Sequence, residues 1–223
     1  MMKIKIIDIG TKSFEDAYQY QLEKVDELVD KRNEQEFAGC FIYVEHPHVY
    51  TLGRHGKTDN LLISEQLLSK INASFVKTDR GGDITYHGPG QIVGYPILDL
   101  MKLQISPKNY VFNLEEVIIR VLAKYGIKGD RINGSIGVWL DVDKPKPRKI
   151  CSIGIRITRN ITMHGFALNV NNDLKYFSYI NPCGFTNIAV TSIANELAHS
   201  VDLEEVKKEI LINFQEIFAI QLI

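Results

Sequence analysis

Residues 79–91 read DRGGDITYHGPGQ and lie between two apolar runs, Ala73–Val76 and Ile92–Leu98. Four of these thirteen residues are glycine, which lets the backbone approach a ligand closely and adopt positive φ angles. A lone Gly-Gly pair would indicate an ordinary hairpin loop. Side chains able to contact a ligand are interleaved with these glycines, namely Arg80, Thr85, Tyr86 and His87. This pattern favours a loop that lines a ligand site. It matches no nucleotide phosphate loop, because neither GxxxxGK nor a GxGxxG that opens a helix is present.

The flanking sequence mixes strands and helices. Hydrophobic periodicity and bounding turn residues predict strands over Lys3–Ile9, Cys40–Val44, Ser74–Thr78, Gln91–Leu98, Ser135–Val142, Lys149–Ile157 and Ile161–Val170. Helices are predicted from Ser13 to about Arg32, over Ser64–Lys70, from Ser106-Pro107 to about Tyr125, and from Asp202 to about Phe218. The order shows no regular β-α alternation, repeat or linker, so we predict a single α+β domain over residues 1–223.

The composition indicates an ordinary soluble globular protein. The chain has 223 residues, of which 45% are hydrophobic and 24% are charged, and its formal net charge of −1 argues against a nucleic-acid-binding protein. No apolar run is long enough to span a membrane, and the N-terminus MMKIKIIDIG indicates a strand and not a signal peptide. The three cysteines are widely spaced, which is typical of reduced thiols, so we expect a cytoplasmic protein.

Two histidines, His46 and His48, could contact one metal ion from an extended segment. No third ligand lies nearby in the sequence, so we expect no metal site. The segment is better interpreted as a turn that leads into a strand, with Arg54 facing a pocket.

Cys183 lies in a turn, Asn181-Pro182-Cys183-Gly184, between a proline that fixes φ and a glycine that leaves room beside the sulfur. Cys40 and Cys151 lie instead in apolar strands, where a cysteine usually has a structural role. The turn therefore favours an accessible thiol at Cys183. To act as a nucleophile, that thiol needs a nearby cation, helix terminus or histidine that lowers its pKa.

Lys149 is the candidate cation for this thiol. On a regular strand it would share a face with Cys151 and the isoleucines that alternate after it, and poor solvation there should lower the lysine's own pKa. The residues alone favour the other interpretation, in which Lys149 is the last solvated residue of the basic loop KPKPRK, Lys144–Lys149. His87 and His164 are the other candidates, although His164 could equally be a core histidine.

These residues occur in motifs that resemble one family. The motifs are EHPHVYTLGR at Glu45–Arg54, RGGDITYHGPGQ at Arg80–Gln91, KICSIGIRI at Lys149–Ile157, HGFALNV at His164–Val170 and NPCG at Asn181–Gly184. In this order over most of the chain, they resemble the octanoyltransferases of lipoate biosynthesis, within the lipoate ligase and biotin ligase superfamily. The resemblance implies that family's α+β catalytic module, with a mixed or antiparallel sheet flanked by helices. It also implies transfer of an octanoyl group from octanoyl-acyl carrier protein to a lysine of a lipoyl-domain protein, such as the glycine-cleavage H protein or a 2-oxoacid dehydrogenase E2 subunit.

By position, the resemblance makes Cys183 the nucleophile that carries the acyl group as a thioester. It makes Lys149 the partner that lowers the thiol pKa and acts as general acid and base. The residues that it implies for the acyl site are Arg80, Gly81, Gly82, Asp83, Ile84, Thr85, Tyr86, His87, Ser152, Ile153, Gly154, Gly165, Phe166 and Ala167. Thioester exchange followed by amide formation implies no ATP, metal or other cofactor.

Two other functions would fit part of this pattern. An ATP-dependent lipoate ligase of the same superfamily would share the glycine-rich stretch and the lysine but would not need Cys183. A non-catalytic carrier-binding module would bind the carrier tightly without forming a covalent acyl adduct.

Two hypotheses concern substrate contacts. The first is that the backbone of Gly81-Gly82 forms one wall of an acyl tunnel, so that Gly82→Val blocks octanoyl transfer and leaves the fold intact. The second is that four cations attract the acidic carrier protein, namely Lys144, Lys146, Arg148 and Arg159.

Overall fold

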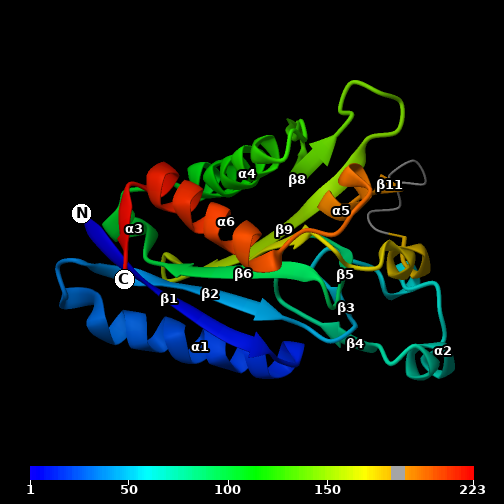
Figure 1. Cartoon of the computed structure of the whole chain (residues 1–223). Coiled ribbons are helices and arrows are strands. Elements are labelled where there is room, and N and C mark those ends of the chain that lie inside the picture. Colours follow the sequence, from blue (N-terminus) through cyan, green and yellow to red (C-terminus); the bar gives the residue numbers. More distant parts are fainter. Residues whose placement is uncertain (182–188) are drawn as a thin grey trace.

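The structure is a computed structural model that describes residues 1–181 and 189–223. Cys183 and the rest of residues 182–188 lie outside the described part of the chain. The main sheet of this part has the strand order β12-β1-β2-β6-β10-β9-β8-β7, and β11 pairs with β9 (Figure 1). The strands are β1 (Met2–Thr11), β2 (Phe37–Glu45), β6 (Gln91–Leu98), β7 (Asp130–Ile132), β8 (Ser135–Leu140), β9 (Arg148–Thr158), β10 (Ile161–Asn169), β11 (Ala189–Val190) and β12 (Ile220–Leu222). Parallel and antiparallel pairs both occur, which confirms the predicted mixed sheet.

Helices cover both faces of the main sheet. The long helices α4 (Pro107–Lys124) and α6 (Leu203–Phe218) lie on one face, and α1 (Phe14–Asp30) lies on the other (Figure 1). Each begins after a predicted capping side chain that accepts a backbone N–H, namely Ser13, Ser106 and Asp202. Buried apolar side chains of α4 and α6 form one core with the sheet, and those of α1 form a second. No helix in the described ranges is long and apolar enough to cross a lipid bilayer.

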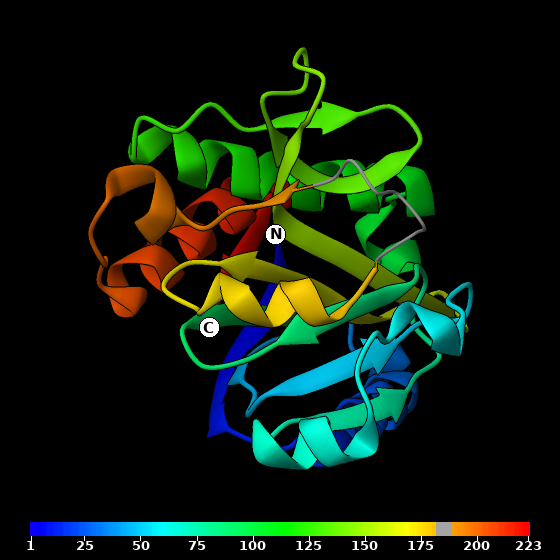
Figure 2. The same ribbon diagram turned by 90° about the vertical axis from the view of Figure 1, so that its right-hand side faces the viewer.

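A small second sheet lies at one end of the main sheet. Its central strand β3 (Val49–Leu52) pairs with β4 (Ser74–Lys77) in parallel and with β5 (Ile84–His87) in antiparallel. Figure 2 views the molecule from this end, where α2 (Glu65–Lys70) accompanies the small sheet. The remaining short elements are η1 (Lys31–Asn33), η2 (Thr58–Asn60), α3 (Leu100–Leu103), η3 (Leu174–Tyr179) and α5 (Ile193–Leu197).

The glycine-rich stretch, residues 79–91, contains a strand that the sequence did not predict. Its residues Ile84–His87 form β5, in which Thr85 pairs with Thr51 of β3. The apolar runs on either side lie in different sheets, so the stretch is not a hairpin loop: it carries the chain from the small sheet into the main sheet. A four-residue strand is too short for its periodicity to be recognised, and the flanking glycines indicated a loop. The edge strands β7 and β12 were missed for the same reason of length.

Proline interrupts the hydrogen bonding of β6, a central strand. Pro96 has no N–H, and a proline is unusual at such a position. The hydroxyl of Thr162 on β10 bridges the gap: it donates to Pro96 O at 2.6 Å and accepts from Leu98 N at 2.9 Å. Thr162 is fully buried, so water cannot replace these bonds. The Thr162 side chain therefore joins β6 to β10 where backbone hydrogen bonds between the two strands are missing.

We predict that Thr162→Val lowers the free energy of unfolding by about 2 kcal/mol, because it leaves the buried Leu98 N–H without its acceptor. Denaturant unfolding measures this change. Thr162→Ser is the matched control: it keeps the hydroxyl and should lose clearly less stability. Equal stability of the valine variant and the wild type would show that this bridge does not stabilise the fold.

Candidate active site

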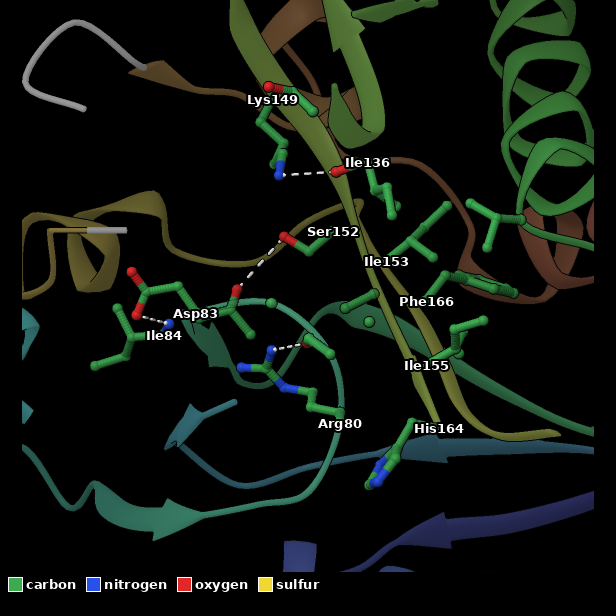
Figure 3. A pocket seen from close by; sticks show the side chains of 18 of the residues that line it. Arg80, Asp83, Ile84, Ile136, Lys149, Ser152, Ile153, Ile155, His164 and Phe166 are labelled. Atoms are coloured by element: carbon green, nitrogen blue, oxygen red, sulfur yellow. Dashed lines mark hydrogen bonds between the residues drawn. The ribbon is translucent and has the colours of Figure 1, made fainter. Parts of the chain in front are cut away.

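A cavity of about 630 Å³ opens between the glycine-rich stretch and the strands β8, β9 and β10. Its lining includes the apolar side chains of Phe14, Trp139, Ile153, Ile155, Phe166, Phe177, Ile180 and Val190. Figure 3 shows Lys149 and His164 toward opposite ends of this space, with Ser152 and Ile155 between them. A mostly apolar cavity with a few polar groups is typical of small-molecule sites, and this one suits a hydrocarbon chain.

The structure brings together the described residues that the sequence analysis assigned to the site, with one exception. Lys149, residues 80–85, His87, residues 152–154 and residues 165–167 all line the cavity. Tyr86 does not.

Tyr86 points away from the cavity because neighbouring side chains of a strand face opposite sides. Its ring is fully buried and stacks on Tyr176 with centroids 4.9 Å apart. Its hydroxyl contacts His48 Nδ1 at 2.8 Å. Tyr86 therefore packs η3 against the small sheet, and this segment leads directly toward residues 182–188.

Lys149 extends from β9 into the cavity. Its Nζ donates to Ile136 O at 3.2 Å and lies 4.4 Å from the centroid of the Trp139 ring (Figure 3 shows the hydrogen bond). Cys151 lies in the core beside the helices and does not line the cavity, so the prediction that it shares a face with Lys149 is wrong. The cause is a shift in the β8–β9 register: Val138 pairs with Cys151 but Trp139 pairs with Lys149. One extra residue on a strand reverses the alternation of its side chains.

The two described cysteines are structural, as predicted. Cys40 and Cys151 are free and buried. Burial raises the pKa of the Cys40 thiol to about 12 and raises that of Cys151 further. Neither thiol forms a useful thiolate at neutral pH.

The described residues on either side of 182–188 both reach the cavity. Ile180 lines it before this segment and Val190 lines it afterwards. Asn181 N donates to Asn60 O at 2.8 Å. On the other side, Val190 pairs with Lys149, and Thr191 N donates to Lys149 O at 3.0 Å. The predicted nucleophile, Cys183, itself lies outside the described residues.

Glycines allow the backbone of residues 80–82 to approach β9. Gly81 N donates to Ile155 O at 2.9 Å, and a Cβ atom on Gly154 would lie 2.8 Å from Gly81 O. Gly82 has a φ of +85°, which residues with a side chain rarely adopt. Gly82→Val would therefore strain the backbone, and it is not the fold-neutral test expected from the sequence.

A chain of buried hydrogen bonds begins at Arg80. Its Nη2 donates to Thr51 Oγ1 at 2.9 Å, and this hydroxyl contacts His87 Nε2 at 3.2 Å. On the other side of the imidazole, His87 Nδ1 contacts Gln91 Oε1 at 2.9 Å. Burial holds the pKa of His87 well below its usual value, so the ring is neutral. It accepts from Thr51 and donates to Gln91.

The same chain continues across the main sheet. Gln91 Nε2 donates to Asn169 Oδ1 at 2.9 Å, and Asn169 Nδ2 donates to Thr191 O at 3.0 Å. Thr191 is the residue whose N–H bonds to Lys149 O. The hydrogen bonds therefore connect the glycine-rich stretch to the backbone of the predicted catalytic lysine.

His164 has a different partner, Asp79. Its Nε2 contacts Asp79 Oδ1 at 2.8 Å, while the other carboxylate oxygen accepts from Tyr18 and pairs with Arg156. The hydrogen bond from His164 is the largest cause that holds the pKa of Asp79 well below its usual value. Burial lowers the pKa of His164, so we infer a neutral ring that donates from Nε2. His164 Nδ1 is buried without a hydrogen-bond partner among the described residues.

The histidine pair considered as metal ligands has protein partners. His46 contacts Lys12 O and Tyr95 Oη, both at 2.8 Å, and burial lowers its pKa to about 4.

Arg54, predicted to face a pocket, has an exposed side chain; the next residue, His55, lines the cavity instead.

The four cations proposed to attract the carrier do not form one surface. Lys144 and Arg148 both pair with Asp141 at 2.6 Å, at the start of β9. Arg159 pairs with Asp26 at 2.8 Å, beyond the opposite end of that strand. The strand has 11 residues and spans roughly 35 Å. These cations are therefore spread over separate parts of the surface, and their attraction of the carrier stays a prediction.

Comparison with known proteins gives the family. Residues 17–215 match the lipoyl protein ligase A/B catalytic domain. An octanoyltransferase of Christiangramia forsetii is 49% identical over 99% of this chain and 97% of its own length. An octanoyltransferase of Bacteroides fragilis is 52% identical over 94% of this chain and 95% of its own length.

Solved structures share the fold at low sequence identity. A bipartite lipoate protein ligase from Thermoplasma acidophilum is 14% identical with a TM-score of 0.74, covering 100% of this chain and 86% of that one. The biotin protein ligase of Aquifex aeolicus is 12% identical with a TM-score of 0.52, covering 98% and 70%. These likenesses confirm the expected fold. The chain therefore belongs to the lipoyl protein ligase A/B catalytic domain family.

Proposed function

We propose that residues 1–223 form one catalytic domain that transfers an octanoyl group from octanoyl-acyl carrier protein to a lysine of a lipoyl-domain protein. The acceptors would be the glycine-cleavage H protein or a 2-oxoacid dehydrogenase E2 subunit. The observation that carries this proposal is the apolar cavity with Lys149 at its edge, in a chain about half identical to octanoyltransferases over nearly its full length. The archaeal ligase with the same fold belongs to a lipoylation system described together with its E2 lipoyl domain, which is consistent with such an acceptor.

In the first step, the Cys183 thiolate attacks the carbonyl carbon of the carrier thioester. Lys149, as an ammonium group, stabilises this thiolate and so lowers the thiol pKa. The tetrahedral intermediate collapses, the carrier thiolate leaves and takes the proton of the Lys149 ammonium group, and the octanoyl group stays on Cys183. One thioester replaces another, so the step needs no external energy source. Two observations support Cys183 as the nucleophile: the other two thiols are buried, and both flanks of its segment reach the cavity.

In the second step, an acceptor lysine amine attacks the acyl-cysteine. Lys149 as a free amine removes a proton from the incoming ammonium group, which makes the acceptor nucleophilic. The C–S bond breaks, the attacking nitrogen loses its second proton to the departing Cys183 thiolate, and an amide forms. Amide formation from a thioester drives the step forward.

Apolar contacts hold the acyl chain between these steps. Burying about six methylene groups at ~0.8 kcal/mol each supplies roughly 5 kcal/mol of gross binding free energy. This is enough to select medium chains, whereas one methylene more or less discriminates weakly.

We predict that intact mass spectrometry after incubation with octanoyl-acyl carrier protein shows one added octanoyl group on the wild type, labile to hydroxylamine. Cys183→Ser should give no hydroxylamine-labile adduct. Lys149→Arg separates the two steps: it keeps the cation, so the adduct should form, but arginine cannot serve as a base, so transfer to the acceptor should fall at least 100-fold.

Two outcomes would contradict the proposal. Modification of the acceptor by Cys183→Ser with ATP and octanoate, and no adduct on the wild type, would indicate a ligase. Tight carrier binding by the wild type with neither adduct nor acceptor modification would indicate a binding module.

We predict that iodoacetamide at pH 8 labels a single thiol, Cys183, in the folded protein. The raised pKa values of Cys40 and Cys151 keep both thiols protonated far above this pH, and burial excludes the reagent. All three cysteines should react in denaturant. Peptide mapping checks the site, and labelling of Cys40 or Cys151 in the folded state would contradict the assignment.

We predict that Ser152→Leu lowers octanoyl transfer about tenfold and shifts preference toward shorter acyl chains, because the larger side chain fills part of the cavity that Ser152 lines. Ser152→Ala is the control and should behave like the wild type. Comparing kcat/KM for hexanoyl and octanoyl carriers measures the shift. Unchanged chain preference in the leucine variant would show that the acyl group lies elsewhere.

A further inference from the structure

The single tryptophan of the chain, Trp139, contacts the cavity lysine. Its side chain is 2% exposed and lines the cavity. The indole Nε1 donates to Ser135 O at 3.0 Å, which fixes the orientation of the ring. Lys149 Nζ lies over that ring, 4.4 Å from its centroid, and bonds to Ile136 O at 3.2 Å. One short segment, residues 135–139, therefore holds both side chains. The Trp139 ring and Ile136 O contact the Lys149 ammonium group, and Ser135 O accepts the hydrogen bond of the indole.

The shifted register of β8 and β9 produces this contact. Trp139 is directly paired with Lys149, although regular pairing from Val138 and Cys151 would place Ile150 opposite the tryptophan. The extra residue turns Lys149 away from the face of Cys151 and toward the cavity. The same irregularity therefore sets both the direction of the lysine and its position over the indole.

We propose that Trp139 is a positioning residue for the octanoyl transfer, holding Lys149 in the cavity and favouring its protonated form in the first step; this rests on the proposed function. An ammonium group over an indole face is stabilised relative to the free amine, which offsets part of the cost of burial. An indole accepts no proton, so it holds the cation without acting as a competing base. Lys149 can therefore still give its proton to the leaving carrier thiolate and act as a free amine in the second step.

Charged groups on the neighbouring elements have their own partners. Glu115 of α4 is buried and pairs with Arg131 at 3.1 Å. Arg148, next to Lys149 in the sequence, pairs with Glu196 of α5. Cys151 is buried with a raised pKa and stays neutral. Substitution of the indole therefore changes the surroundings of Nζ without adding or removing a formal charge.

The test compares Trp139→Leu, which removes the aromatic face, with Trp139→Phe, which keeps one. We expect the leucine variant to lose about tenfold in the rate of Cys183 acylation, with KM for the carrier changed less than twofold. The phenylalanine variant should retain at least a third of the wild-type rate. Because the amine form of Lys149 becomes more favourable without the ring, the basic limb of the acylation pH profile should move to lower pH by about half a unit or more in the leucine variant.

Fluorescence of the sole tryptophan gives a readout that needs no turnover. Emission of the wild type should titrate between about pH 7 and pH 11, and Lys149→Met should abolish that transition. The proposal would be overturned if the leucine and phenylalanine variants were acylated at equal rates and the basic limb of the pH profile did not move. Identical fluorescence titrations of the wild type and Lys149→Met would also overturn it. If Lys149→Met transferred octanoyl groups at the wild-type rate, the proposed function would be overturned instead. The fluorescence titration would still decide whether the indole senses the protonation of Lys149.

Discussion

The structure around the cavity depends on one buried chain of hydrogen bonds. It runs from Arg80 through Thr51, His87 and Gln91 to Asn169, and then to the backbone of Thr191. Side chains from both sheets take part, so the chain joins the small sheet to the main sheet. Each polar group is removed from water, and loss of any partner would leave a buried donor or acceptor unsatisfied. The glycine-rich stretch is therefore held in one position relative to β9 and β11, the strands that carry and pair with Lys149.

Two of the histidines that line the cavity, His87 and His164, have separate structural roles within this arrangement. His87 is a neutral link in the buried chain, and His164 donates to Asp79 on the other side of the cavity. Neither ring therefore has the free, solvated character of a simple general base. The proposed proton transfers fall to Lys149, whose side chain reaches into the cavity from β9. Packing thus gives His87 and His164 supporting roles, separate from that of Lys149, the proposed reacting group.

Much of the fold could be predicted because its long elements carry strong local signals. Capping side chains marked the starts of α1, α4 and α6, and periodic apolar residues marked the long strands. The short strands β5, β7 and β12 carry no such signal, because three or four residues form a strand only when a neighbour pairs with them. Among the site residues, Tyr86 was misplaced for this reason: without β5, nothing indicated that it alternates away from Thr85 and His87.

By itself, the sequence determined the family motifs, the glycine-rich stretch and the distinction between two apolar-strand cysteines and one cysteine in a turn, because each depends on local residue types and spacing. Only the tertiary structure decided which strands share a sheet and that Lys149 faces away from Cys151. It also placed Trp139 beside the lysine and assigned separate partners to His87 and His164. These features depend on strand register and on contacts between residues far apart in the chain. A one-residue shift in pairing reverses the faces of a strand, and no local pattern records that shift.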